Sequence, residues 1–323
     1  MIMDLAQAIH KGLHDLLTHH KEVRLMGEDI GVNGGVFRVT DGLQATFGDD
    51  RVIDTPLAEN MLAGLALGMA TQGLFPIVEF QFMAFMYPAM EQIKSHISCY
   101  RTRTQGRLTC PMIIRTPYGS GVFAPEHHSE STEAMFCGIP GLRVVVPSTP
   151  QRAYALLMAA YQCQDPVLFL EPTLLYRTVK QPIDPTQHAL AIDQAIIEQP
   201  GEDFTLIAWG AMMQPARHIH THFKALGLNV ELIDLVSLNP VDYATLNQSV
   251  SKTGRCVIIQ EGANHMGLAN QIAGVIQRSA WEYLKQPILT ISGHDCCLPY
   301  PQLEPFYKPD TKRIINEVLT WMQ

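Results

Sequence analysis

Short apolar runs recur along the whole chain, and segments with helical periodicity separate most of them. The runs of the first half are apolar without alternation, and they cover residues 23–26, 51–54, 74–80, 112–116, 142–147 and 166–171. Strands that are apolar on both faces are typical of parallel sheets with helices on both sides. Helical spacing of apolar or small residues is found at 4–20, 58–70, 87–100 and 150–161. The sequence therefore predicts an α/β fold.

The pattern changes between residues 178 and 203, where Pro182, Pro185 and Pro200 stand among scattered polar residues. A second series follows, with strand-like runs at 204–209, 230–235, 256–260 and 288–291 and helical segments at 214–226, 240–251 and 267–284. A chain of 323 residues also exceeds the size at which one hydrophobic core stops growing. We therefore expect two consecutive three-layer α/β/α domains, at residues 1–180 and 204–323, with a connection at 181–203.

Composition limits the partners and the compartment of the chain. Acidic residues outnumber basic ones by 31 to 23, which disfavours nucleic-acid binding, because no basic run offers a site for phosphate. The seven cysteines are irregularly spaced and form no CxxC pair, which disfavours a disulfide framework or a zinc site. The N-terminal residues lack the features of a targeting peptide, and no apolar stretch is long enough to span a membrane. We expect a soluble cytoplasmic protein.

Charged residues make up only 17% of the chain, below the roughly 25% that is usual, which indicates surface hidden in a subunit contact. The helical segment that follows Pro56, a residue suited to a first helical turn, is rich in small residues. Such residues let another backbone approach closely, either in the core of this chain or at a partner; they are Ala58, Ala63, Gly64, Ala66, Gly68 and Ala70.

Two segments carry side chains that are suited to chemistry. The sequence DTPLAE at 54–59 follows an expected strand and begins a helix, and ligands bind at this end of parallel strands. Glu59 there is either a functional carboxylate or a residue that complements the helix dipole. The second segment, residues 118–131, is a glycine-bearing loop that contains His127 and His128. These histidines are candidates for acid–base chemistry, or are hydrogen-bonded loop residues.

These segments and several others match one family in order. The matching sequences are GEDIG at 27–31, DTPLAE at 54–59, EFQFMAF at 79–85, RTPYG at 115–119, HSES at 128–131, PGLRVVVPSTP at 140–150, FLEP at 169–172 and LIAWG at 206–210, followed by Glu261-Gly262. With them, the chain resembles the beta subunit of the thiamine-diphosphate-dependent first component of 2-oxo acid dehydrogenase complexes. The resemblance runs nearly end to end and implies a transketolase-like fold, with a pyrimidine-binding domain and then a transketolase C-terminal-like domain.

The resemblance implies that thiamine diphosphate lies between this chain and an alpha subunit. The alpha subunit would hold the diphosphate and Mg²⁺ through a GDG…N motif, which this chain lacks, since Gly48 is followed by two aspartates. Glu59 matches the carboxylate that faces a ring nitrogen of the aminopyrimidine, and Phe85 matches the aromatic residue that packs on that ring. Gln81 and Met83 would lie nearby.

His128 matches the active-site histidine of the family, and His127 is the weaker candidate. A histidine at this position would bind the carboxylate or oxyanion of the substrate and assist reductive acylation of a lipoyl group. Ser129 and Glu130 would set its tautomer. The family also implies a K⁺ ion held by backbone carbonyls near Met112, Ala160, Cys163 and Asp165.

The same resemblance implies an alpha2beta2 heterotetramer that serves a dihydrolipoamide acyltransferase core and its lipoyl domains. The loop sequence GVFAPEHHS at 121–129 is most similar to bacterial pyruvate dehydrogenase beta subunits, which favours pyruvate as the substrate. Branched-chain 2-oxo acid and acetoin dehydrogenases share most of the other motifs and stay open as alternatives. A non-catalytic scaffold subunit is an alternative of another class, and a free-standing transketolase is disfavoured by the missing diphosphate motif.

Overall fold

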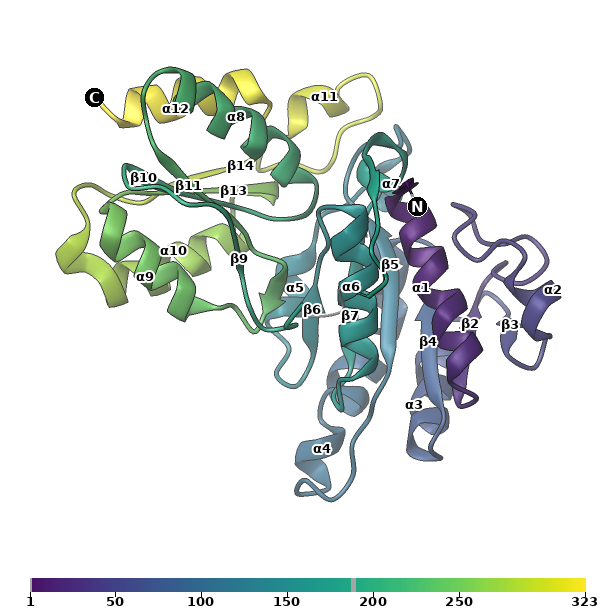
Figure 1. Ribbon diagram of the computed structural model, residues 1–323. Coiled ribbons are helices and arrows are strands. Elements are labelled where there is room, and N and C mark those ends of the chain that lie inside the picture. The colour runs from purple at the N-terminus through teal and green to yellow at the C-terminus, as the bar shows by residue number, and fades with distance from the viewer. Residues whose placement is uncertain (1, 187–189) are drawn as a thin grey trace.

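The computed structural model describes residues 2–186 and 190–323, which form two α/β domains side by side (Figure 1). A seven-stranded sheet has the order β12-β6-β7-β5-β4-β2-β3, and a five-stranded sheet has the order β14-β13-β10-β11-β9. Helices cover both faces of each sheet, as Figure 1 shows for the second sheet, where α8 and α12 lie on one side and α9 and α10 on the other. The predicted three-layer architecture is therefore confirmed.

The core of the first sheet is parallel, as its apolar strands predict. Its strands are β2 (Val23–Gly27), β3 (Val52–Asp54), β4 (Phe75–Glu79), β5 (Ile113–Tyr118), β6 (Arg143–Val145) and β7 (Val167–Pro172). The long helices around it are α1 (Leu5–His19), α3 (Glu59–Thr71) and α6 (Pro150–Tyr161). Short helices connect these elements; they are α2 (Leu43–Phe47), α4 (Tyr100–Arg103), α5 (Glu133–Cys137) and α7 (Leu175–Thr178).

The second sheet is parallel except for its edge strand β9, which pairs antiparallel with β11. Its strands are β9 (Ile196–Gln199), β10 (Phe204–Ala208), β11 (Val230–Asp234), β13 (Cys256–Ala263) and β14 (Leu289–Gly293). Its helices are α8 (Met213–Ala225), α9 (Tyr243–Thr253), α10 (Leu268–Ala280), α11 (Glu304–Tyr307) and α12 (Thr311–Trp321). β9 lies inside the expected connection 181–203, of which residues 187–189 are outside the described part of the chain.

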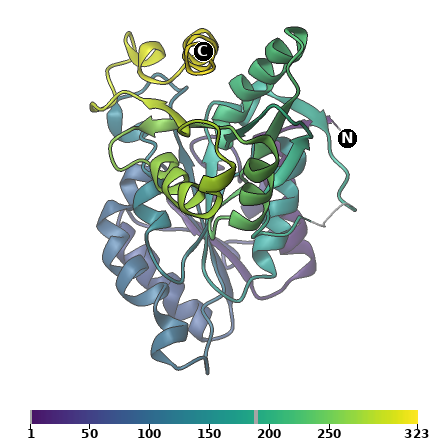
Figure 2. The same cartoon turned by 90° about the vertical axis from the view of Figure 1, so that its left-hand side faces the viewer.

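The two domains are fastened to each other along one boundary, where the second half of the chain stacks on the first (Figure 2). Strand β12 (Ser237–Asn239) comes from the second half but pairs antiparallel with β6 of the first sheet. An ion-pair network adds to this contact, since Arg152 on α6 reaches Asp234 at 2.6 Å and Glu198 at 2.8 Å. A shared sheet and partly buried ion pairs hold the two domains together.

The expected helix over 87–100 is wrong as a single element. The segment forms a 3₁₀ helix η1 (Met83–Ala89), a π-helix η2 (Gln92–Ile97) and then α4. Pro88 lies inside η1, and a proline supplies no N–H for the hydrogen-bond ladder of a regular α-helix. Pro56 likewise lies outside the helix it was expected to begin, because α3 starts at Glu59.

The small residues of helix α3 lie on two faces, a buried inner face and an open outer face. Ala63, Ala66 and Ala70 are buried in the core, whereas a side chain added at Gly68 would meet no atom within 4 Å. Large apolar residues stand exposed on and beside this outer face, with fractional exposures of 79% for Leu57, 43% for Met61 and 42% for Leu65. An apolar face with open glycine positions fits the close approach of another subunit.

We expect the chain on its own to self-associate through this outer face of α3, because the face is apolar and unpartnered within the described chain. Replacing Met61 and Leu65 with glutamine should reduce the mean mass measured by sedimentation. Leu226→Gln, which removes an exposed leucine of the second domain, is the matched control and should leave the mass unchanged. A monodisperse monomer of the unmodified chain at micromolar concentration would contradict this expectation.

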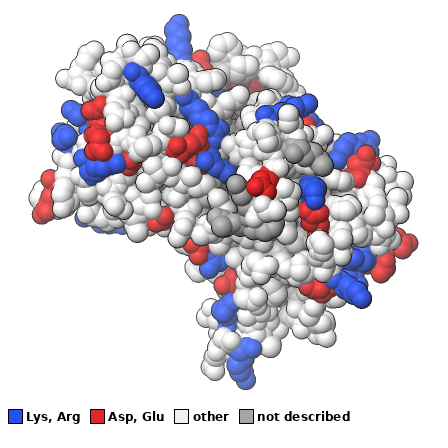
Figure 3. Space-filling view, in the orientation of Figure 1, with Lys and Arg blue, Asp and Glu red and all other residues white. Residues whose placement is uncertain are grey.

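The rest of the surface carries mixed charge. On the face in Figure 3, Lys and Arg side chains alternate with Asp and Glu in small groups, separated by wide uncharged areas. Within residues 2–186 and 190–323, no helix combines the length and the apolar character needed to cross a membrane.

Candidate functional site

Four adjacent strands of the first sheet bring the candidate residues to one edge. β3, β2, β4 and β5 are neighbours, and because they are parallel their carboxyl ends lie together. Glu59 follows β3, Glu28 follows β2, Phe85 follows β4, and the loop with His128 follows β5. Segments that are far apart in the sequence therefore meet where parallel sheets bind ligands.

A cavity of about 380 Å³ opens at this edge. Its walls are mostly apolar, with one carboxylate, one phenol and one imidazole. The structure thus brings together Glu59 and Phe85, two residues singled out in the sequence, and adds Tyr87, for which spacing gave no signal. The cavity is lined by Leu57, Glu59, Ala84, Phe85, Tyr87, Pro88 and His127.

His128 lies beside this cavity and packs on aromatic rings. Its ring centroid is 4.5 Å from that of Phe82 and 5.2 Å from that of Phe85, both in edge-to-face geometry. Its Nδ1 atom is buried and has no hydrogen-bond partner within the described chain. A buried polar atom without a partner is costly and uncommon in folded proteins, which marks this histidine as a candidate functional residue.

His127 belongs to a separate polar network. Its Nδ1 is 3.4 Å from Glu130 Oε1, and Glu130 also accepts a hydrogen bond from the Tyr87 hydroxyl. Burial first, and then the Glu130 carboxylate, raise the pKa of Tyr87 to about 12. The expectation that Ser129 and Glu130 set the tautomer of His128 is wrong, because Glu130 is engaged here and the Ser129 hydroxyl has no partner in the described chain.

Glu59 has a second carboxylate as a neighbour. Glu28 is 6% exposed, and its pKa is raised by burial and then by the charges of Glu59 and Asp29. Two carboxyl groups in one partly buried region favour the state in which one of them keeps a proton. Glu28 belongs to the GEDIG sequence, but only the fold places it next to Glu59.

A buried ion cluster links the strands that carry this edge of the sheet. Arg115 on β5 forms a bidentate pair with Glu171 on β7, with distances of 2.7 and 2.9 Å, and also donates to Glu79 on β4. The Tyr176 hydroxyl donates to Glu171 at 2.5 Å. Buried bidentate pairs with satisfied hydrogen bonds fix the strands that carry the site in one arrangement.

Two other residues assigned by resemblance, Gln81 and Met83, lie outside the cavity wall. Met83 is 1% exposed within the hydrophobic core, and Gln81 is half-buried on the same segment. Neither is among the residues that line the cavity, so their contact with a cofactor stays a prediction.

The region expected to bind K⁺ lies at the start of β5 and the end of α6. The carbonyl oxygen of Met112 accepts from Val167 N–H at 3.0 Å, and that of Ala160 accepts from Cys163 N–H at 3.1 Å. Asp165 pairs with Arg101 at 2.6 Å. The ion stays a prediction.

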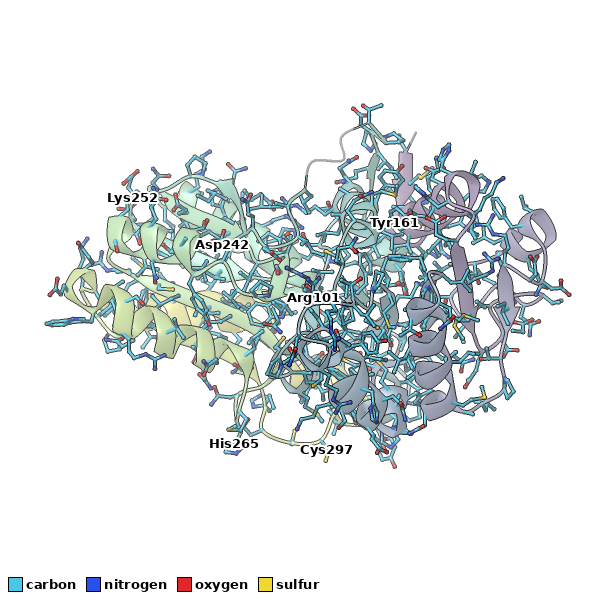
Figure 4. The ribbon with its side chains drawn as sticks, turned by 90° about the horizontal axis from the view of Figure 1, so that it is seen from below. Arg101, Tyr161, Asp242, Lys252, His265 and Cys297 are labelled. Carbon is cyan, nitrogen blue, oxygen red and sulfur yellow. The ribbon has the colours of Figure 1, made fainter. Side chains whose placement is uncertain are left out.

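A second cavity of about 380 Å³ lies on the other side of the histidine loop. His127 lines it too, opposite residues of the second domain such as Cys296, Cys297 and Tyr307. Figure 4 shows Cys297 and His265 at the outer edge of that domain, on two loops linked by a 2.6 Å hydrogen bond from His265 N–H to Asp295. The histidine loop therefore forms a wall between the candidate site and the second domain.

A buried carboxyl group follows this loop, where α5 of the first domain contacts the second domain. Glu133 on α5 accepts from Trp209 Nε1 at 3.0 Å, and its other oxygen has no partner in the described chain. Burial, with a further contribution from the charge of Glu261, raises the pKa of Glu133 from 4.5 to about 7. The ionised form of this group is therefore less stable in the folded protein than in the unfolded chain.

We expect Glu133→Gln to stabilise the protein at pH 8 but not at pH 5. Since the folded pKa exceeds the unfolded one, the native protein loses stability as the pH rises from about 4.5 to 7, by on the order of 3 kcal/mol in total. Glutamine can still accept the bond from Trp209 and carries no charge. The measurement is the thermal unfolding midpoint of both proteins from pH 5 to pH 8, and equal midpoints at every pH would refute the expectation.

Comparisons with known proteins agree with this geometry. Residues 2–179 match the family "Transketolase, pyrimidine binding domain", and residues 193–314 match "Transketolase, C-terminal domain". A solved chain described as "Split gene transketolase, inactive beta4 tetramer" superposes with a TM-score of 0.81, at 21% identity and over 99% of this chain and 98% of that one. The fold is that of transketolase-like proteins.

Curated relatives of nearly the same length narrow the class. The Staphylococcus epidermidis "Pyruvate dehydrogenase E1 component subunit beta" is 41% identical over 98% of this chain and 97% of its own. The Bacillus subtilis protein of the same name is 38% identical over 97% of each. The Mycobacterium tuberculosis "3-methyl-2-oxobutanoate dehydrogenase subunit beta" is 40% identical over 97% of this chain and 90% of its own. The chain belongs to the family of 2-oxo acid dehydrogenase E1 beta subunits.

Proposed function

We propose that this chain and an alpha subunit together form a thiamine-diphosphate-dependent 2-oxo acid dehydrogenase, in which each chain supplies half of the active site. The observation that carries the proposal is the single cavity that has both Glu59 and Phe85 in its wall, with His128 packed behind Phe85. The chain has no diphosphate-binding motif of its own, so the partner would hold the diphosphate and Mg²⁺.

The residues of the cavity fit the pyrimidine end of the cofactor. A flat aromatic side chain such as Phe85 offers stacking area to a planar ring, and Glu59 offers a carboxylate to a ring nitrogen. Thiamine diphosphate supplies the carbon nucleophile at which a 2-oxo acid loses carbon dioxide. Glu59 would hold a proton at that ring nitrogen.

His128 would act on the substrate from its place beside the cavity. Its imidazole would donate to the substrate carboxylate or to an oxyanion, and would later move a proton during acylation of a lipoyl group. No hydrogen bond within the described chain holds its Nδ1 atom. The rings of Phe82 and Phe85 limit its rotation, because each contacts the imidazole edge to face. The retention of all three residues supports a catalytic subunit over a non-catalytic scaffold.

Pyruvate is the substrate that we favour, on the loop sequence at 121–129. Overall sequence identity does not distinguish the candidate substrates. The relative whose name specifies pyruvate is 41% identical to this chain, and the one whose name specifies 3-methyl-2-oxobutanoate is 40% identical. Phe123 in this loop is 58% exposed, so the alpha subunit would complete the pocket around it. We further propose a cytoplasmic alpha2beta2 heterotetramer that acylates the lipoyl domains of an acyltransferase core.

The test is co-expression of this chain with an alpha chain that carries the GDG…N motif. Acylation of a lipoyl domain is then compared for pyruvate, branched 2-oxo acids and acetoin at equal concentration. We expect the highest kcat/KM with pyruvate. A preference for a branched 2-oxo acid or for acetoin would keep the family assignment and replace the substrate.

A further inference from the structure

The loop that carries His128 is closed at its base and anchored from outside its own domain. Gly119 N–H donates to the carbonyl oxygen of Glu130 at 3.1 Å, which joins the two ends of the loop. Its tip forms the short 3₁₀ helix η3 (Glu126–His128). Because the two ends of the loop are joined, groups that hold this base restrict where the loop can place His128.

Glu261, from β13 of the second domain, holds one end of that base. A single carboxylate oxygen of Glu261 accepts from both Ser120 N–H and the Ser120 hydroxyl, each at 2.6 Å. Both residues are almost fully buried, with 4% exposure for Glu261 and 1% for Ser120. Short charge-assisted hydrogen bonds in a buried place are stronger than ordinary ones, and their loss leaves buried donors unsatisfied.

The adjacent residue of β13 supports the other end of the loop. A side-chain carbon at Gly262 would come within 2.7 Å of the carbonyl oxygen of Ser131, so the two backbones are in direct contact. Two further groups of the second domain reach the first end, since Glu304 accepts from Gly121 N–H at 2.7 Å and Lys308 donates to the Ser120 hydroxyl at 2.9 Å.

We propose that Glu261 is a positioning residue for His128, acting from the second domain through the base of the 119–132 loop. Although Glu261 lies outside the cavity, it restrains the segment that places the imidazole against Phe82 and Phe85. The second domain thereby contributes to the candidate active site without touching the substrate. This inference rests on the proposed function of His128.

The test is a double-mutant cycle in the assembled enzyme with a lipoyl domain as acceptor. Glu261→Ala should lower the rate of lipoyl acylation by about 10- to 100-fold, because small displacements of a catalytic group are costly. Glu261→Gln keeps an oxygen that can accept both bonds from Ser120 and should recover most of that loss. In a His128→Ala background, Glu261→Ala should have no additional effect, since the residue through which it acts is absent.

Matched variants keep the result interpretable. Glu198→Gln weakens another contact between the domains, the ion pair with Arg152, away from the loop, and should leave acylation unchanged. If Glu261→Ala does not assemble, Ser120→Ala removes one of the same two bonds and should give a smaller loss that also disappears in the His128→Ala background.

Three outcomes would overturn the proposal. They are wild-type acylation by Glu261→Ala, an additive loss in the double variant, and an equal loss in Glu198→Gln, which would indicate only a weakened domain boundary. Failure of the proposed function is distinguishable, because in that case His128→Ala alone would leave acylation unaffected.

Discussion

Replacing Glu59 with glutamine is expected to lower turnover of the assembled enzyme by at least about 100-fold, the usual scale for losing a proton-transfer group. Glutamine has nearly the same shape but cannot hold and release a proton at a ring nitrogen. The side chain lies at the start of α3 in the cavity wall, where an amide is sterically tolerated. Turnover with the favoured 2-oxo acid and the mass of the complex are the two measurements.

The matched control for this variant is Glu282→Gln. Glu282 is also a glutamate in a first helical turn, that of the short 3₁₀ helix η5 (Trp281–Tyr283), but it is exposed on the second domain. It should retain full turnover. If Glu59→Gln were as active as this control, Glu59 would have no part in proton transfer, and the cavity would need another function.

Replacing His128 with alanine should lower the rate of acyl transfer to a lipoyl domain by about 100-fold, again the scale of one acid–base group. Decarboxylation measured with an artificial electron acceptor should fall less, because the cofactor performs that step and Glu59 remains in place. The contacts that His128 makes with Phe82 and Phe85 are edge-to-face contacts at the border of a cavity, so the fold should survive.

His127→Ala distinguishes the two adjacent histidines. His127 is exposed and pairs with Glu130, so its loss should disturb the Tyr87 network and give a smaller defect than the loss of His128. A larger defect for His127→Ala would transfer the catalytic assignment to His127.

Most of the fold could be predicted from local pattern, because buried parallel strands are continuous apolar runs. Two strands could not be predicted from local pattern, because each depends on the strand with which it pairs. β12 is only three residues long and pairs with β6, and β9 is an edge strand whose residues are alternately half-buried and exposed. Helix α12 follows the last predicted strand and has a clear apolar face, so its periodicity could have been detected.

The candidate site could be predicted only where a residue belongs to a family motif. Glu59, Phe85 and His128 were assigned in that way, and the fold places them at one sheet edge. The supporting contacts could not be predicted, because no spacing in a single sequence relates Ser120 to Glu261, which are 141 residues apart, or Tyr87 to Glu130, which are 43 apart.

The central claim is that this chain is half of an active site, and reconstitution tests it most directly. This chain, the GDG…N-bearing alpha chain and an equimolar mixture are each assayed for acylation of a lipoyl domain by pyruvate, branched 2-oxo acids and acetoin. We expect activity only in the mixture, and none when Glu59→Gln is mixed with the alpha chain into a complex of unchanged mass. Activity of this chain alone, or an assembled complex that is inactive with every substrate, would contradict the claim.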